Sequence, residues 1–147
     1  MILWRVSEFA TLDGAGGLIV GGRWHSKGRP IVYLADSSAL AMLEMLVHLE
    51  IETLPPSFQL LKVGVPDGLD HALWPEGEDP RDAAATRAWG DAWLEAAATP
   101  LARVPSIVAP HGANWLLNPG HDAAAKVRIE ESSRWPWDER LFANSDR

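Results

Sequence analysis

Three residues in the first third of the chain have side chains suited to chemistry on a flat, charged ligand: Arg23, Tyr33 and Glu44. A guanidinium can hold a phosphate through two parallel hydrogen bonds, and an aromatic ring can stack on a heterocycle. A carboxylate can stabilise a positive charge that develops beside it. Together these properties suit a nicotinamide dinucleotide whose N-glycosidic bond is broken, because that cleavage passes through an oxocarbenium-like ribose.

The sequence predicts that these residues come from a loop, a strand and a helix. Two glycines precede Arg23 and let the backbone approach a ligand closely. Tyr33 belongs to a predicted strand over residues 31–34, which is rich in β-branched and aromatic side chains. Glu44 lies near the edge of the apolar face of a helix predicted over residues 39–49. A carboxylate in that position needs a polar partner.

Four further residues are candidates for binding the same ligand. Trp24 and Ser26 lie on the same loop as the arginine and offer a stacking face and a hydroxyl. Ser106 is expected at the start of a strand over residues 104–108, where a serine usually caps local backbone. Asn118 precedes a proline and usually forms a turn. The last two would contact ligand only if the fold brings them to the same pocket.

Each candidate also has a structural explanation. Arg23 could be a surface side chain whose stem lies on a neighbouring ring, and Tyr33 could be a core aromatic. Glu44 could pair with His48 one turn along the helix. The competing class of function is therefore a non-enzymatic protein-interaction module in which this Arg-Tyr-Glu set is structural. The tryptophans and an acidic loop over residues 73–80 would then bind the partner.

Composition limits the class of function further. The chain has 147 residues, a formal charge of −7 and a pI near 5.1, which predicts one domain without a basic surface for nucleic acid. It has no cysteine, and its five histidines form no ligand pair, so we expect no metal. No segment approaches the ~20 apolar residues of a membrane span, and the N-terminus lacks a signal-peptide pattern. We expect a cytoplasmic protein with no membrane contact.

Outside the candidate site, hydrophobic pattern and turn residues predict the other elements. The expected strands are at 2–6, 58–65 and 126–130, with a short strand or turn at 115–117; the expected helix is at 82–98, and loops are expected at 7–22 and 73–80. Gly90 interrupts the second helix at some cost in helix propensity. The aromatic segment 135–142 is expected to pack.

Several sequence blocks, taken in order, resemble the RES-domain family, which is named for its arginine, glutamate and serine. The blocks are LWR at 3–5, GGRWHSKGRPIVYLA from 21, LEMLVHLE from 43, VPS at 104–106, WLLNP from 115 and DERLF from 138. They cover nearly the whole chain. His25 stands where many relatives have asparagine, and Trp115 replaces a common tyrosine. These departures concern fine substrate contacts and leave the core pattern intact.

The resemblance implies one RES-type domain over residues 1–147 with a compact, ADP-ribosyltransferase-like α+β fold, in which helices flank a mixed or antiparallel β core. It implies a toxin that arrests growth by cleaving NAD, its substrate, with Arg23, Glu44 and Ser106 as the name-giving residues and Tyr33 as an essential tyrosine. It also implies a cognate Xre-like antitoxin that blocks the active site, and a homodimer within the complex. Some relatives are thought to deplete NAD, and others to modify an enzyme of nucleotide synthesis. Whether ADP-ribose goes to water, phosphate or a protein side chain stays open.

Overall fold

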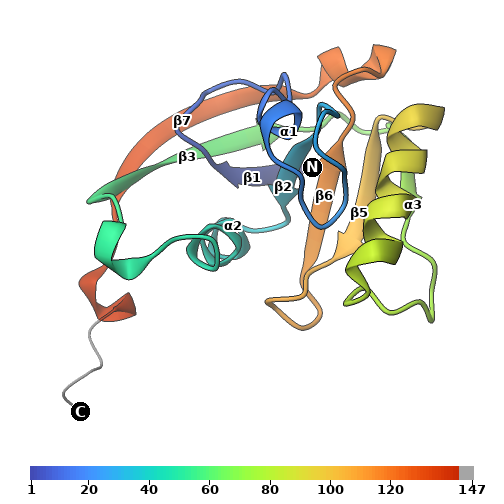
Figure 1. Ribbon diagram of the computed structural model, residues 1–147. Helices are drawn as coiled ribbons and strands as arrows, with labels where there is room; N and C mark the ends of the chain where they lie inside the picture. The colour runs from blue at the N-terminus through green and yellow to red at the C-terminus, as the bar shows by residue number, and fades with distance from the viewer. Residues whose placement is uncertain (143–147) are drawn as a thin grey trace.

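A mixed sheet of seven strands runs through the computed structural model, which describes residues 1–142 (Figure 1). The strands are β1 (Ile2–Val6), β2 (Val32–Ala35), β3 (Ser57–Gly64), β4 (His71–Leu73), β5 (Leu101–Pro105), β6 (Ala113–Leu117) and β7 (Arg128–Pro136). Their order in the sheet is β4-β5-β6-β2-β1-β3-β7. Only β4 and β5 are parallel; every other neighbouring pair is antiparallel.

Helices lie against this sheet, which confirms the α+β class. In the described part of the chain they are α1 (Gly16–Ile19), α2 (Ser38–Leu46) and α3 (Ala83–Ala96), with 3-10 turns η1 (Ile51–Thr53), η2 (Asp122–Lys126) and η3 (Glu139–Leu141). In Figure 1, α2 lies below β1 and β2, whereas α3 lies beside β5 at the other end of the sheet. None of these helices is long and apolar enough to cross a membrane.

The two central strands place Tyr33 in the middle of the sheet. β2 pairs with β6 so that Tyr33 lies opposite Leu116, and successive side chains of a strand point to opposite faces. Val32 and Leu34 are buried in one core cluster, whereas Tyr33 packs against a second cluster that includes Leu116 and residues of α3. Tyr33 therefore projects from the face of the sheet that packs against α3.

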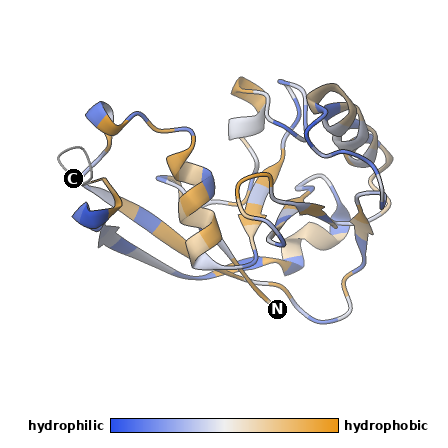
Figure 2. Ribbon diagram, turned by 90° about the horizontal axis from the view of Figure 1, so that it is seen from below, coloured by the Kyte–Doolittle hydropathy of each residue, from blue (hydrophilic) through white to orange (hydrophobic). Residues whose placement is uncertain are grey.

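Helix α2 is held against the sheet by its N-terminal half. The Ser37 side chain caps it by accepting a hydrogen bond from the Leu40 N–H at 3.0 Å. Leu40 and Ala41 are buried in a third core cluster, and Figure 2 shows that most of the helix is hydrophobic. Glu44 lies one turn after Leu40, so it is carried on the same side of the helix. The helix ends at Leu46, three residues earlier than the sequence predicted, because tighter i−3 hydrogen bonds follow.

The strand predicted over residues 104–108 is wrong in position. β5 spans Leu101–Pro105, and Ser106 begins the turn that leads to β6, where its N–H bonds to the Gly112 carbonyl at 2.9 Å. Proline has no N–H, so Pro105 can end a strand as well as begin one. The burial of Leu101 and Ala102 shows that the strand lies before this proline. Ser106 therefore follows a strand end.

The other sequence predictions are mostly confirmed. The predicted second helix is α3, with Asp82 as its cap. The predicted loop over 7–22 contains the single turn α1, and the strand predicted over 126–130 begins at Arg128 and runs to Pro136. In the aromatic tail, Trp137 packs on Phe58 with ring centroids 4.2 Å apart, whereas Trp135 is exposed. The end of the predicted domain, residues 143–147, lies outside the described residues.

Candidate active site

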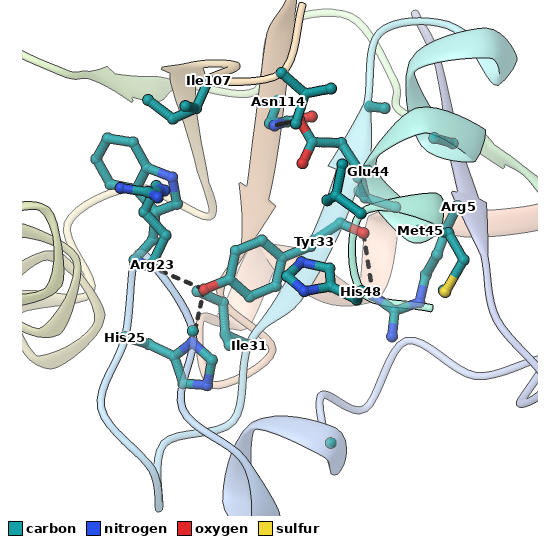
Figure 3. Close-up of a pocket in the computed structure, with 18 of the residues that line it drawn as sticks. Arg5, Arg23, His25, Ile31, Tyr33, Glu44, Met45, His48, Ile107 and Asn114 are labelled. Atoms are coloured by element: carbon teal, nitrogen blue, oxygen red, sulfur yellow. Dashed lines mark hydrogen bonds between the residues drawn. The ribbon is translucent and has the colours of Figure 1, made fainter. Parts of the chain in front are cut away.

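A cavity of about 710 Å³ lies between α2 and the loop that precedes β2. Its volume is within the roughly 300–1,000 Å³ of small-molecule sites. Its wall includes Arg23, Tyr33 and Glu44, which come from three different elements (Figure 3). The fold therefore brings together the three residues that the sequence selected as catalytic candidates.

The Tyr33 hydroxyl is fully engaged with the loop that carries Arg23. It lies 2.7 Å from His25 Nδ1 and accepts a hydrogen bond from the Trp24 N–H at 3.2 Å. His25 Nε2 lies 2.9 Å from the Val20 carbonyl, which can only accept, so Nε2 carries the imidazole proton. His25 Nδ1 then accepts the Tyr33 O–H. The hydroxyl of Tyr33 fixes the loop, and its ring remains available to a ligand.

Burial keeps this pair uncharged at neutral pH. Desolvation raises the pKa of Tyr33 to about 12. Desolvation also lowers the pKa of His25, which is 3% exposed, despite the hydrogen bond to the Val20 carbonyl. A protonated imidazole would lose its acceptor at Nδ1 and leave the Tyr33 O–H without a partner. The neutral form of His25 is therefore the one that this network requires.

We expect acid to destabilise the fold through His25. A pKa that is lower in the folded than in the unfolded state means that the unfolded chain binds more protons below about pH 6.5, so stability falls as pH decreases there. Melting temperatures measured between about pH 7.5 and pH 5.5 should fall more steeply for the wild type than for His25→Asn, which has no titrating group. Parallel pH dependence in the two proteins would contradict this role of His25.

Helix α3 clamps the backbone of the Arg23 loop. The Thr86 hydroxyl donates to the Arg23 carbonyl at 2.7 Å, and Arg87 Nε donates to the Gly22 carbonyl at 3.3 Å. One turn further along α3, Gly90 lies directly against the Trp24 backbone, where a Cβ would overlap the carbonyl oxygen. The position of Arg23 is thus set by contacts from a helix more than 60 residues later in the chain.

The Arg23 guanidinium lies at the cavity wall and makes one hydrogen bond to the protein. Its Nη1 donates to the Pro80 carbonyl at 3.2 Å. This bond uses one of the five N–H donors of an arginine. The other donors are compatible with binding an anion in the cavity.

Two residues predicted to bind ligand beside Arg23 have other partners. The Trp24 ring is buried and packs edge-on against Trp74 and Trp89, with centroids 5.1 and 5.8 Å away, although Trp24 also contributes to the cavity wall. Ser26 donates its N–H to Asp91 Oδ1 at 2.8 Å and its O–H to Asp91 Oδ2 at 2.5 Å, and it is not part of that wall. Burial disfavours the ionised Asp91, but the hydrogen bonds from Ser26 outweigh this and lower the pKa of Asp91. Ser26 anchors the loop to α3.

Glu44 is held through one of its two carboxylate oxygens. Oε1 accepts a hydrogen bond from Ser106 Oγ at 2.7 Å and another from Asn114 Nδ2 at 2.9 Å. Ser106 Oγ in turn accepts from the N–H groups of Val108 and Ala109 at 3.2 and 3.0 Å. Both donors to Glu44 converge on Oε1, which leaves Oε2 for a ligand. The partner that the sequence required for Glu44 is thus Ser106, together with Asn114, and His48 is not in hydrogen bond with it.

Asn118 lies apart from Glu44. It is buried, its Nδ2 donates to the Leu94 carbonyl at 3.0 Å, and its Oδ1 accepts from the Gly120 N–H at 3.0 Å. Asn118 lines a separate, smaller cavity of about 270 Å³ together with Arg29. In this position it ties a turn to the end of α3.

Arg5 is a cavity residue that the sequence analysis did not select. β1 and β2 pair only at Trp4 and Ala35, and beyond this pair Arg5 Nη1 donates to the Tyr33 carbonyl at 3.0 Å. Burial lowers the pKa of Arg5, and its Nε is buried without a hydrogen-bond partner. Arg5 and Arg23 lie on either side of Tyr33 in Figure 3. An arginine inside the apolar strand ILWRV was the signal that could have found it.

The described residues offer no competing metal centre. No group of three or more histidine, aspartate or glutamate side chains in residues 1–142 could hold a metal ion. The cavity wall holds three guanidiniums, of Arg5, Arg23 and Arg87, together with the Tyr33 ring and the Glu44 carboxylate. These groups can bind an anion, stack a heterocycle and stabilise a cation.

Comparison with known proteins identifies relatives over nearly the whole length. The family model described as RES domain matches residues 2–138. The protein called Toxin Res from Pseudomonas putida is 44% identical over 146 residues, which cover 97% of this chain and all of that protein. The Prs ADP-ribosylating toxin of Sphingobium sp. is 35% identical over 153 residues, covering 95% of each chain.

A solved structure has the same fold at low sequence identity. A chain of the M. tuberculosis MbcT–MbcA toxin–antitoxin complex superposes with a TM-score of 0.74 and 18% identity. The match covers 92% of this chain and 84% of that one. At this identity the similarity shows the fold alone.

Proposed function

Because the chain belongs to the RES-domain family, we propose that it is the toxin of a bacterial toxin–antitoxin system and that it acts by cleaving NAD. The observation that carries the proposal is the convergence of Arg23, Tyr33 and Glu44 on one cavity, with Glu44 held so that Oε2 is free. The relative named as a Prs ADP-ribosylating toxin supports the use of ADP-ribose chemistry.

In this proposal each candidate has one task. Nicotinamide stacks on the Tyr33 ring, and the guanidinium of Arg23 holds the diphosphate. Arg5 fixes the Tyr33 backbone and adds positive charge on the other side of the ring. Glu44 Oε2 lies beside the ribose that was joined to nicotinamide. Of the remaining predicted contacts, Trp24, Ser26 and Ser106 act by holding the loops around the ligand, whereas Asn118 ties a turn to α3 away from this cavity.

The reaction breaks the bond between ribose C1′ and the pyridinium nitrogen. The bonding electrons go to that nitrogen, so nicotinamide leaves as a neutral molecule and needs little acid assistance. Positive charge develops on the ribose, where the Glu44 carboxylate stabilises it. A nucleophile then bonds to C1′ and loses a proton. Water or phosphate as the nucleophile would deplete NAD, and a protein side chain would make the enzyme an ADP-ribosyltransferase.

Exposed apolar residues near the cavity support a protein partner that covers it. Val20 and Val47 line the cavity and are 65% and 56% exposed. Leu43 and Ile51, each four residues from Val47 along the chain, are 42% and 65% exposed. Apolar side chains gathered in this way are typical of an interaction surface. We assign this surface to an Xre-like antitoxin, in a cytoplasmic complex that contains a toxin homodimer.

Expression of the chain alone in bacteria tests this function. Without its antitoxin, the wild type should arrest growth and lower cellular NAD or label a cellular protein with ADP-ribose. Glu44→Gln should be tolerated at the same protein level. Harmless expression of the wild type, with unchanged NAD and no label, would favour the protein-interaction module instead.

A further inference from the structure

We propose that Asn114 is a positioning residue that fixes the Glu44 carboxylate for reaction. The inference rests on the proposed NAD cleavage and assigns a role to a residue that the sequence analysis passed over. Its basis is the 2.9 Å hydrogen bond from Asn114 Nδ2 to Glu44 Oε1, which joins strand β6 to helix α2.

The register of the sheet places Asn114 on the cavity side. Asn114 lies opposite Ala35 and Leu116 lies opposite Tyr33 in the antiparallel pair of β6 and β2. Directly opposed residues share a face, and so do residues two apart in a strand. Asn114 therefore projects on the same face as Tyr33, and it contributes to the cavity wall. In Figure 3 its side chain points toward the Glu44 carboxylate.

The chemistry of the pair fixes how the amide is oriented. An ionised carboxylate only accepts hydrogen bonds, so the NH₂ of Asn114 faces Glu44 and not the amide oxygen. A bond from an amide N–H to a charged acceptor is stronger than a neutral one. This hydrogen bond therefore fixes the orientation of both side chains, Asn114 and Glu44.

Ser106 alone would leave the carboxylate free to turn. The terminal torsion of glutamate is broad and roughly two-fold. A single hydrogen bond to Oε1 therefore leaves the carboxylate able to rotate about its bond to the rest of the side chain. A second donor from another direction removes this freedom. Ser106 lies after β5 and Asn114 lies in β6, and both donate to Oε1 of a residue on α2. Three elements therefore converge to point Oε2 into the cavity.

Two substitutions separate a positioning role from a packing role. Asn114→Leu has a similar volume but no N–H, and Asn114→Asp keeps the shape but puts a carboxylate against Oε1. If Asn114 positions Glu44, kcat for NAD should fall on the order of 10²-fold in Asn114→Leu and further in Asn114→Asp, with KM nearly unchanged. If Asn114 only fills space, the isosteric Asn114→Asp should be the more active variant.

The experiment compares steady-state NAD turnover by the two variants, Ser106→Ala and the wild type, with thermal melts of each. Ser106→Ala combined with Asn114→Leu should lose less than the sum of the single effects on the activation free energy, because both changes release the same oxygen. Wild-type kcat in Asn114→Leu, a rise in KM alone, or the reverse order of the two variants would overturn the inference. If Asn114→Leu does not fold, the test depends on the isosteric Asn114→Asp. A folded Asn114→Asp protein with wild-type kcat would contradict the inference. Absence of turnover by the wild type both with and without bacterial lysate would instead reject the proposed function, and this inference with it.

Discussion

Glu44→Gln is expected to lower kcat for NAD cleavage by on the order of 10²–10³-fold while NAD still binds. Glutamine keeps the length and shape of glutamate and removes its charge. Its amide oxygen can still accept the bonds from Ser106 and Asn114 that now end at Oε1. The fold should therefore remain, and only the stabilisation of the ribose cation should be lost. Turnover measured by chromatography and NAD affinity measured by calorimetry would separate the two effects.

A matched control for this substitution is Glu50→Gln. Glu50 is an exposed carboxylate after the end of α2, and the same change there removes one charge without touching the cavity wall. It should keep wild-type kcat. Glu44→Gln that consumes NAD at the wild-type rate would show that the catalytic carboxylate has been assigned wrongly.

Gly90→Ala is expected to be the most destabilising single-methyl change in α3. A Cβ at this position would overlap the carbonyl oxygen of Trp24, which belongs to backbone and not to a flexible side chain. The loop cannot easily withdraw, because Thr86 and Asp91 hold it on both sides of the contact. Because the overlap is with backbone, we expect a cost at the upper end of the usual range for overpacking, about 3 kcal/mol, which exceeds the gain of about 1 kcal/mol in helix propensity by about 2 kcal/mol.

Thermal unfolding measures this effect. A net loss of about 2 kcal/mol in a chain of this size lowers the melting temperature by roughly 4–8 °C. Gly16→Ala is the matched control, since a Cβ there meets open space and the melting temperature should change little. A melting temperature of Gly90→Ala equal to or above the wild type would show that α3 does not pack against Trp24 as described.

The sequence predicts the elements that carry Tyr33 and Glu44, because the patterns that define these elements involve only residues near in the chain. Tyr33 lies in a short β-branched strand and Glu44 in a strongly patterned helix, and both patterns depend only on near neighbours. Each element formed close to the predicted bounds. The same is true of α3, where periodic tryptophans outweighed the low helix propensity of Gly90.

Sequence patterns do not reveal partners that come from distant parts of the chain. The sequence predicts Ser106 near a strand start because a proline can begin a strand, whereas Pro105 ends β5. Asn114 is a poor strand former, and its partner Glu44 is 70 residues away, so no local pattern identifies it. Residue type alone makes Asn118 and Ser26 candidates for binding ligand, and the fold gives them partners at Leu94 and Asp91 of α3.

His25 shows how a departure from a family pattern can be interpreted. From the sequence alone, this histidine is interpreted as a variation in substrate contacts. In the structure it connects the Val20 carbonyl to the Tyr33 hydroxyl and so supports the loop from inside. The role of the residue depends on the tautomer that these two bonds select, and a sequence does not reveal that.

Release of free nicotinamide from NAD by the purified protein tests the central claim most directly. Wild type and Glu44→Gln would be incubated with NAD, with and without bacterial lysate, and nicotinamide, ADP-ribose products and labelled proteins quantified by mass spectrometry. The account predicts one nicotinamide for each NAD lost with the wild type in at least one of the two conditions, and almost none with Glu44→Gln. NAD that stays intact with the wild type in both conditions, or that disappears without release of nicotinamide, would contradict it.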